Sequence, residues 1–132
     1  MGLTTTRELR WDAPGAPVLN GQVGSFYNLV KAFLVSCGWS IEWDEPANYK
    51  VVLRNSLAHG GSGCYVRVLD DGSSAGGARV ARMDVYEAMT DIDTGSAPAG
   101  RGWFWKAWQA NANPTSYTAH GDERTFYLTN YT

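Results

Sequence analysis

Candidate cation ligands occur in two acidic turns of the sequence. The segments DDG at 70–72 and DIDTG at 91–95 each place aspartate before glycine, as calcium-binding loops do. An EF-hand loop also needs a third oxygen ligand before its glycine and a glutamate at its twelfth position, and counting from Asp91 reaches Gly102. Aspartate is favoured in turns because its carboxylate accepts hydrogen bonds from the backbone that follows. We therefore predict turns here and no metal site.

Groups that could carry out catalysis are also sparse. His59 and His120 each precede a glycine, but no GxSxG segment or comparable signature supplies a nucleophile for them to activate. Adjacent acids such as Asp122 and Glu123 would serve glycoside hydrolysis only at a set separation of their carboxyl groups. The glycine-rich segments lack the phosphate-binding pattern GxxxxGK(S/T). We expect no enzymatic activity, no catalytic residue and no cofactor.

The composition restricts the class of protein and its partners. The 132 residues fit one domain, and a net charge of −2 without a basic run argues against a nucleic-acid partner. No apolar run approaches the roughly 18 residues of a membrane span, and no secretory signal is present, so we expect folding in a cytosol and no membrane partner. Only 18% of the residues are charged, against about 25% in typical soluble domains. Either partners cover part of the surface, or the chain is a compact β-rich protein with large turns.

The elements that would position any site are one helix and a series of strands. Apolar residues recur at helical spacing between Phe26 and Cys37, which predicts an amphipathic helix over residues 23–37. A period of two follows at 39–43, 49–54, 64–69 and 80–86, and further strands are expected at 103–108 and 125–129. Cys37 and Cys64 fall on these elements, so we interpret them as small buried hydrophobic residues without a disulfide.

The expected fold is of the α+β class. It has a mostly antiparallel β-sheet of about six strands with the single amphipathic helix packed on it. Residues 1–21 show no sustained period and contain Pro14 and Pro17, so we predict an extended N-terminal arm before one domain at 22–132. The arm carries more apolar groups than a solvated tail would, and is expected to lie against its own domain or a neighbouring subunit.

Four large aromatic residues lie close together near the C-terminal end. Trp103, Phe104, Trp105 and Trp108 exceed what one strand can bury on one face, and alternation places Trp103 with Trp105 and opposite Phe104. One face would then meet a protein partner or stack on sugar rings. The alternative is that both faces are buried, between the sheet and the helix or arm.

Three stretches resemble a family of small virion proteins of tailed bacteriophages. They are DAPGAPVLNGQVGSFYNLVKAFLVSCGW at 12–39, RMDVYEAMTDIDTG at 82–95 and DERTFYL at 122–128. The segments NYKVVLRNS at 48–56 and CYVRVLDDG at 64–72 are similar in kind to the middle strands of that family. The resemblance implies a structural component of the virion without catalysis or cofactor. The sequence departs from the family at 103–108 and 111–121, where contacts with partners would be specific to this phage or prophage.

The thin charge, the arm and the surplus aromatic residues agree with a role in an assembly. We expect a capsid decoration (cement) protein, present in many copies or as a homo-oligomer, that binds the major capsid protein or other virion proteins. It would be assembled into the virion in the cytoplasm of the bacterial host. A component of the neck, tail or baseplate is one alternative, and a carbohydrate-binding module that aids host adsorption is another. The predicted interface residues are Leu3, Leu9, Trp11, Val18, Trp103, Trp105 and Trp108.

Overall fold

A computed structural model describes residues 6–96 and 100–131 of the chain, except for the side chain of His59. The described residues form ten strands, one α-helix and three single-turn 3-10 helices. The strands are β1 (Arg7–Arg10), β2 (Ser40–Glu45), β3 (Lys50–Arg54), β4 (Tyr65–Leu69), β5 (Val80–Tyr86), β6 (Met89–Asp91), β7 (Thr94–Gly95), β8 (Gly100–Trp105), β9 (Ser116–Gly121) and β10 (Phe126–Tyr131). The helices are α1 (Ser25–Ser36) and the 3-10 turns η1 (Pro46–Asn48), η2 (Leu57–His59) and η3 (Gly77–Arg79).

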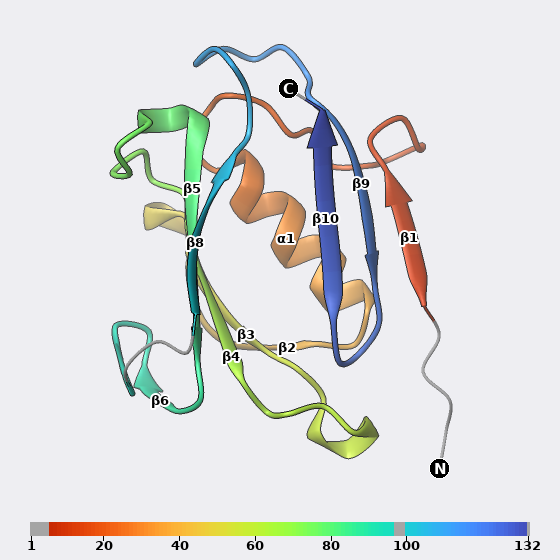
Figure 1. Cartoon of the computed structure of the whole chain (residues 1–132), viewed down its shortest axis with the longest axis vertical. Helices are drawn as coiled ribbons and strands as arrows, with labels where there is room; N and C mark the ends of the chain where they lie inside the picture. Colours follow the sequence, from red (N-terminus) through yellow and green to blue (C-terminus); the bar gives the residue numbers. More distant parts are fainter. Residues whose placement is uncertain (1–5, 97–99, 132) are drawn as a thin grey trace.

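The helix α1 lies between two antiparallel sheets (Figure 1). The larger sheet has five strands in the order β2-β3-β4-β5-β8, and the smaller sheet has three in the order β1-β9-β10. A separate hairpin, β6–β7, extends beyond the end of β5. Figure 1 shows the edge strands β8 and β10 on either side of α1. The single helix therefore packs against both sheets at once.

The position of α1 follows from its apolar stripe and from glycine at each end. Phe26, Leu29 and Leu34 are completely buried, as helical spacing requires. Gly24 precedes the helix at a φ of 85°, and a Cβ there would also contact the Tyr49 ring. Gly38 follows the helix at a φ of 98°. The helix predicted over residues 23–37 accordingly lies at Ser25–Ser36.

The main core lies between α1 and the inner faces of both sheets. The larger sheet contributes Val51, Leu53, Val66, Val68, Ala81 and Phe104, and β9 contributes Tyr117 and Ala119. The Phe104 ring stacks on that of Phe26 with a centroid distance of 4.6 Å. Because side chains alternate along a strand, Trp103 and Trp105 on either side of Phe104 face away from α1.

The predicted fold is wrong in its strand number, its sheet arrangement and its N-terminal arm. The strands form three sheets, and Arg7–Arg10 pairs with β9 in the register Leu9↔Ala119, so no extended arm is present in the described part of the chain. The pairing escaped prediction because β1 reads RELR, with one apolar residue, and its partner lies more than a hundred residues away. Further along the supposed arm, Leu19 is fully buried in the core.

Candidate functional site

Exposed tryptophans gather at the end of β8 and in the loop that follows it. Trp103, Trp105 and Trp108 have 58%, 50% and 71% of their surface exposed. We call these three residues the tryptophan surface. Alternation along β8 places the first two on the outer face of the larger sheet, since Phe104 between them packs inward. Side chains of this size are normally buried, so their shared exposure marks a surface suited to a partner.

Arg79 joins the strand end to the loop. Its guanidinium carbon lies 5.3 Å from the centroid of the Trp105 ring, in a cation–π contact. The same side chain donates hydrogen bonds to the carbonyl oxygens of Trp108 (2.9 Å) and Gly76 (3.3 Å). One arginine thus fixes Trp105 relative to the backbone that carries Trp108, so the tryptophan surface is partly organised before any partner binds.

A buried carboxylate between two arginines lies beside Trp103 on the same outer face. Arg101 Nε donates to Asp84 Oδ1 at 2.8 Å, and Arg82 donates to Asp84 Oδ2 from Nη2 at 2.9 Å and Nε at 3.1 Å. Burial of the Asp84 carboxyl acts to raise its pKa, but the hydrogen bonds and positive charges of Arg82 and Arg101 outweigh burial and lower the pKa below its usual value. The carboxylate therefore stays ionised at neutral pH, and the outer face keeps a net positive charge there.

The arrangement around Asp84 predicts a specific loss of stability in acid. A carboxyl with a lowered pKa in the folded state contributes stability above its unfolded pKa of about 3.9, and the contribution disappears as the pH falls through the folded value. We expect Asp84→Asn to lower the free energy of unfolding by about 2 kcal/mol at pH 6. The difference from the unsubstituted chain should shrink as the pH falls below about 4. Urea unfolding between pH 6 and pH 2 measures this, and a difference that stays constant over that range would contradict it.

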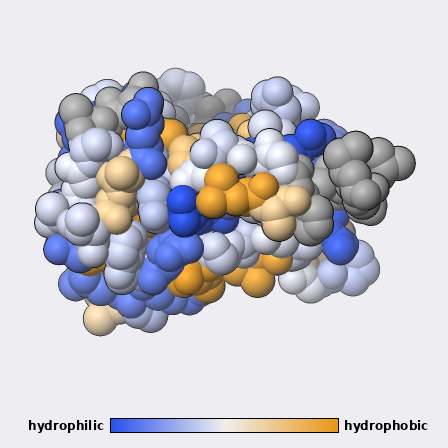
Figure 2. Space-filling model, turned by 90° about the horizontal axis from the view of Figure 1, so that it is seen from below, coloured by the Kyte–Doolittle hydropathy of each residue, from blue (hydrophilic) through white to orange (hydrophobic). Residues whose placement is uncertain are grey.

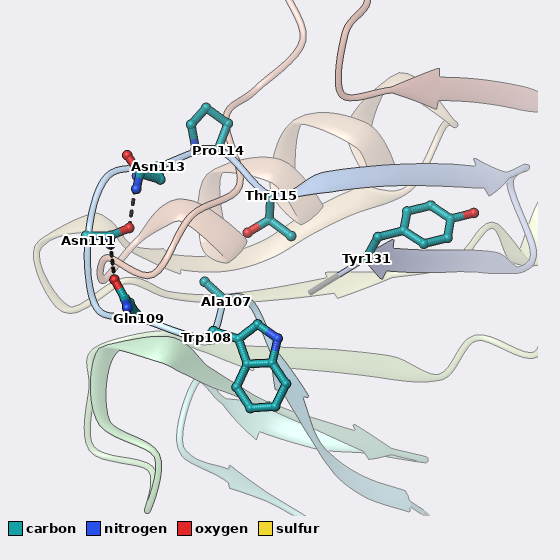
Figure 3. A pocket seen from close by; sticks show the side chains of 8 residues that line it. All are labelled: Ala107, Trp108, Gln109, Asn111, Asn113, Pro114, Thr115 and Tyr131. Atoms are coloured by element: carbon teal, nitrogen blue, oxygen red, sulfur yellow. Dashed lines mark hydrogen bonds between the residues drawn. The ribbon is translucent and has the colours of Figure 1, made fainter.

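A groove lies between the loop after β8 and the end of β10 (Figure 3). Its volume is about 250 Å³, and its lining includes Trp108, Tyr131 and three amide side chains, Gln109, Asn111 and Asn113. Asn111 Nδ2 donates to Gln109 Oε1 at 3.0 Å, and the Asn113 backbone N–H donates to Asn111 Oδ1 at 3.1 Å. Figure 3 shows the three amides at the bend of the loop, the Trp108 ring below Ala107, and the Tyr131 ring at the end of β10, directed away from the bend. Aromatic faces beside amides are the chemistry that sugar hydroxyls and rings bind.

Asp70 and Lys106 form an ion pair in the interior, just beyond the strands β4 and β8. Both side chains have no exposed surface, and Lys106 Nζ lies 2.6 Å from Asp70 Oδ1 and 2.6 Å from the Gln22 carbonyl oxygen. Asp70 Oδ2 accepts hydrogen bonds from the backbone N–H groups of Phe26 (2.8 Å) and Tyr27 (3.2 Å). The carboxylate therefore caps the first turn of α1 from a distant part of the chain, and the positive end of the helix favours its charge.

Burial changes the ionisation of both partners. Loss of solvent raises the pKa of Asp70 and lowers the pKa of Lys106, while their mutual hydrogen bond and charges oppose both changes. Such shifts are also found at active sites. Here no solute reaches either side chain in the folded state, because neither has exposed surface. We interpret the pair as a structural link that holds the start of α1 against the end of β4 and the start of the loop that carries Trp108.

The structure separates the predicted interface residues into two groups. Leu3 lies outside the described residues. Leu9 is half-buried against the main core, whereas Trp11 and Val18 are exposed. Trp11 follows β1, which Figure 1 shows on the far side of the smaller sheet from β8. The tryptophans at 103, 105 and 108 thus lie together, and the N-terminal residues do not join them. The interface role of both groups stays a prediction.

Sequence reasoning missed the polar residues around the tryptophan surface. Arg82 and Asp84 share a strand face, which the alternation of Val80–Tyr86 indicated, but their partner Arg101 comes from another strand. Lys106 is a single cation among aromatic residues and gave no signal of a buried partner. Arg79 and Tyr131 reach the site only through the folded arrangement of η3 and β10.

Other candidate chemistry receives no support from the described residues. Among residues 6–96 and 100–131, no group of three or more His, Cys, Asp or Glu side chains is placed to hold a metal ion. Both cysteines are free, and burial raises the pKa of the Cys37 thiol. None of the described helices is long and apolar enough to cross a membrane. On the face drawn in Figure 2, hydrophobic residues form small separate groups among hydrophilic ones.

Comparisons with family models, curated proteins and solved structures found no match to this chain.

Proposed function

We propose that this chain is a structural protein of a bacteriophage virion that binds neighbouring protein subunits through the tryptophan surface. The observation that carries the proposal is the joint exposure of Trp103, Trp105 and Trp108 on one strand end and its loop. Tryptophan and arginine are the residues most enriched at the energetic centres of protein interfaces, and Arg79 and Arg101 lie beside these tryptophans. The sequence resemblance at 12–39, 82–95 and 122–128 to virion proteins is the reason for proposing that the assembly is a virion.

Within the virion, we place the chain on the outside of the capsid as a decoration protein. A protein that binds only the assembled shell stabilises that shell by mass action. We expect particles without this chain to release their genome at a lower temperature than complete particles, and purified chain added in excess to restore the original temperature. A fluorescent dye that reports released DNA during heating measures both. Equal release temperatures with and without the chain would overturn placement on the shell. If particles assembled without the chain lack tails, that result would favour a place in the neck or tail instead.

A carbohydrate-binding module is the second candidate, favoured by the groove beside Trp108. Two exposed aromatic rings and three amide side chains line it, and the amides of Gln109 and Asn113 retain hydrogen-bonding capacity beyond the bonds described above. On this candidate, Trp108→Ala removes retention of the protein on immobilised host polysaccharide. Under the leading proposal, the unsubstituted chain shows no such retention.

A further inference from the structure

Among the described residues, no strand pairs with the outer edge of β8. Trp105 directs its carbonyl oxygen away from β5, since that oxygen accepts a hydrogen bond from Asn130 Nδ2 at 2.7 Å. The N–H and C=O of one residue point to the same side of a strand, and the side alternates along the chain. Arg101 and Trp103 therefore also direct their backbone groups outward. Within residues 6–96 and 100–131, β8 pairs with β5 alone, so the outward backbone groups of Arg101 and Trp103 have no partner strand.

Two glycines leave open space on the inner face of the same edge. Gly100 and Gly102 pair with Val85 and Met83, and a Cβ added at either glycine would meet no atom within 4 Å. Val85 and Met83 are only half-buried as a result, although both pack against the main core. We call this space the glycine notch. An added strand would place alternate side chains in the notch and bury both residues.

The opposite face of the edge is positively charged. Arg82 and Arg101 share a single carboxylate, Asp84, and Arg101 is the most exposed member of these ion pairs. Arg79 adds a third positive charge on this face, over the Trp105 ring. Natural edge strands often carry a charge that repels other strands. Arg101 repels an incoming strand only weakly, because its Nε already donates a hydrogen bond to Asp84 Oδ1 at 2.8 Å. The uncompensated positive charge is instead suited to an acidic side chain of an incoming strand.

We propose that β8 is an acceptor edge, which pairs with an extended segment of a neighbouring virion subunit whose apolar residues alternate with acidic ones. The apolar residues fill the glycine notch, and the acidic residues lie over Arg101 and its neighbours. A second copy of this chain fits less well, because it would bring two such positive faces together. A nucleic acid would neutralise the arginines but leave the edge backbone and the notch unfilled. Only the identity of the neighbour as a virion subunit rests on the proposed function.

The test uses the isolated chain and a synthetic octapeptide in which valine and glutamate alternate. We expect the peptide to slow hydrogen exchange at the amides of Arg101, Trp103 and Trp105, as observed by NMR. The amides of Gly102 and Phe104 already bond to β5 and should change little. A matched peptide with lysine in place of glutamate should give no protection. Because no virion is involved, the result is independent of whether the chain proves to be a virion protein.

Two variants separate edge pairing from a general change in the fold. Gly102→Leu fills the notch from within, where space is free and φ is not positive, so folding and the melting temperature should be kept. Its affinity for the acidic peptide should fall at least about tenfold. Thr129→Leu on the other edge strand, β10, is the control and should bind normally. Equal protection by both peptides, protection that grows with protein concentration alone, or binding of oligothymidine without edge protection would each overturn the proposal.

Discussion

Replacing Asp70 with asparagine, or Lys106 with methionine, is expected to lower the free energy of unfolding by about 3–5 kcal/mol. Each change leaves one charged group in an interior without exposed surface and without its ionic partner. In Lys106→Met, the Asp70 carboxylate keeps only the two backbone N–H donors of α1. In Asp70→Asn, an NH2 group replaces one carboxylate oxygen, so the side chain has no negative charge and its single oxygen cannot accept from both the ammonium and the N–H groups of α1. Urea unfolding followed by tryptophan fluorescence measures both losses.

A matched control and a double variant make this prediction specific. Lys31→Met breaks the partly exposed pair of Lys31 with Asp44, and should cost about 1 kcal/mol or less. The double variant Asp70→Asn, Lys106→Met buries no unpaired charge and should lose clearly less than the sum of its single changes. If each single change lowers the free energy of unfolding by no more than Lys31→Met does, the pair does not stabilise the contact between α1 and the strand ends.

The second large effect concerns binding. Under the proposed function, we expect the double substitution Trp103→Ala, Trp105→Ala to weaken association with virion particles by on the order of a hundredfold. Stability should change by about 1 kcal/mol or less, because both side chains are at least half exposed. The assay is co-sedimentation of purified chain with particles that lack it.

Tyr127→Ala provides the control for exposed aromatic surface in general. Tyr127 is as exposed as Trp108 but lies on β10 of the smaller sheet, and its loss should leave co-sedimentation unchanged. Equal effects of the control and the tryptophan variant would show that the tryptophan surface is not the contact. Retained co-sedimentation of the tryptophan variant would contradict the prediction outright.

The sequence predicted the elements whose pattern is local. The stripe from Phe26 to Cys37 indicated α1, and the alternation at 49–54, 64–69 and 80–86 coincides with β3, β4 and β5. The strands β1, β6, β7 and β9 escaped because they are short or carry few apolar residues. Tyr117, Ala119 and Gly121 of β9 are buried and alternate with Thr118 and His120, but alanine and glycine are too weakly apolar to give a strong period of two. Pairing partners far apart in the chain leave no local signal, so the two-sheet arrangement had to come from the structure.

In the candidate site, too, only the features that belong to a single strand could be predicted from the sequence. Alternation placed Trp103 and Trp105 on one face, because that property belongs to a single strand. The contact of Arg79 with Trp105, the ion pairs of Asp84 and the buried pair of Asp70 with Lys106 join residues from different elements. Their geometry depends on register and layer order, which the sequence does not encode locally.

The most direct test of the central proposal is the copy number of this chain in purified virions, measured by quantitative mass spectrometry against the major capsid protein. A decoration protein of the shell should be present in hundreds of copies per particle, because it binds at every repeat of a symmetric surface. Six to about a dozen copies would contradict the placement on the capsid and indicate the neck or tail. Absence of the chain from the particle would contradict the virion proposal as a whole.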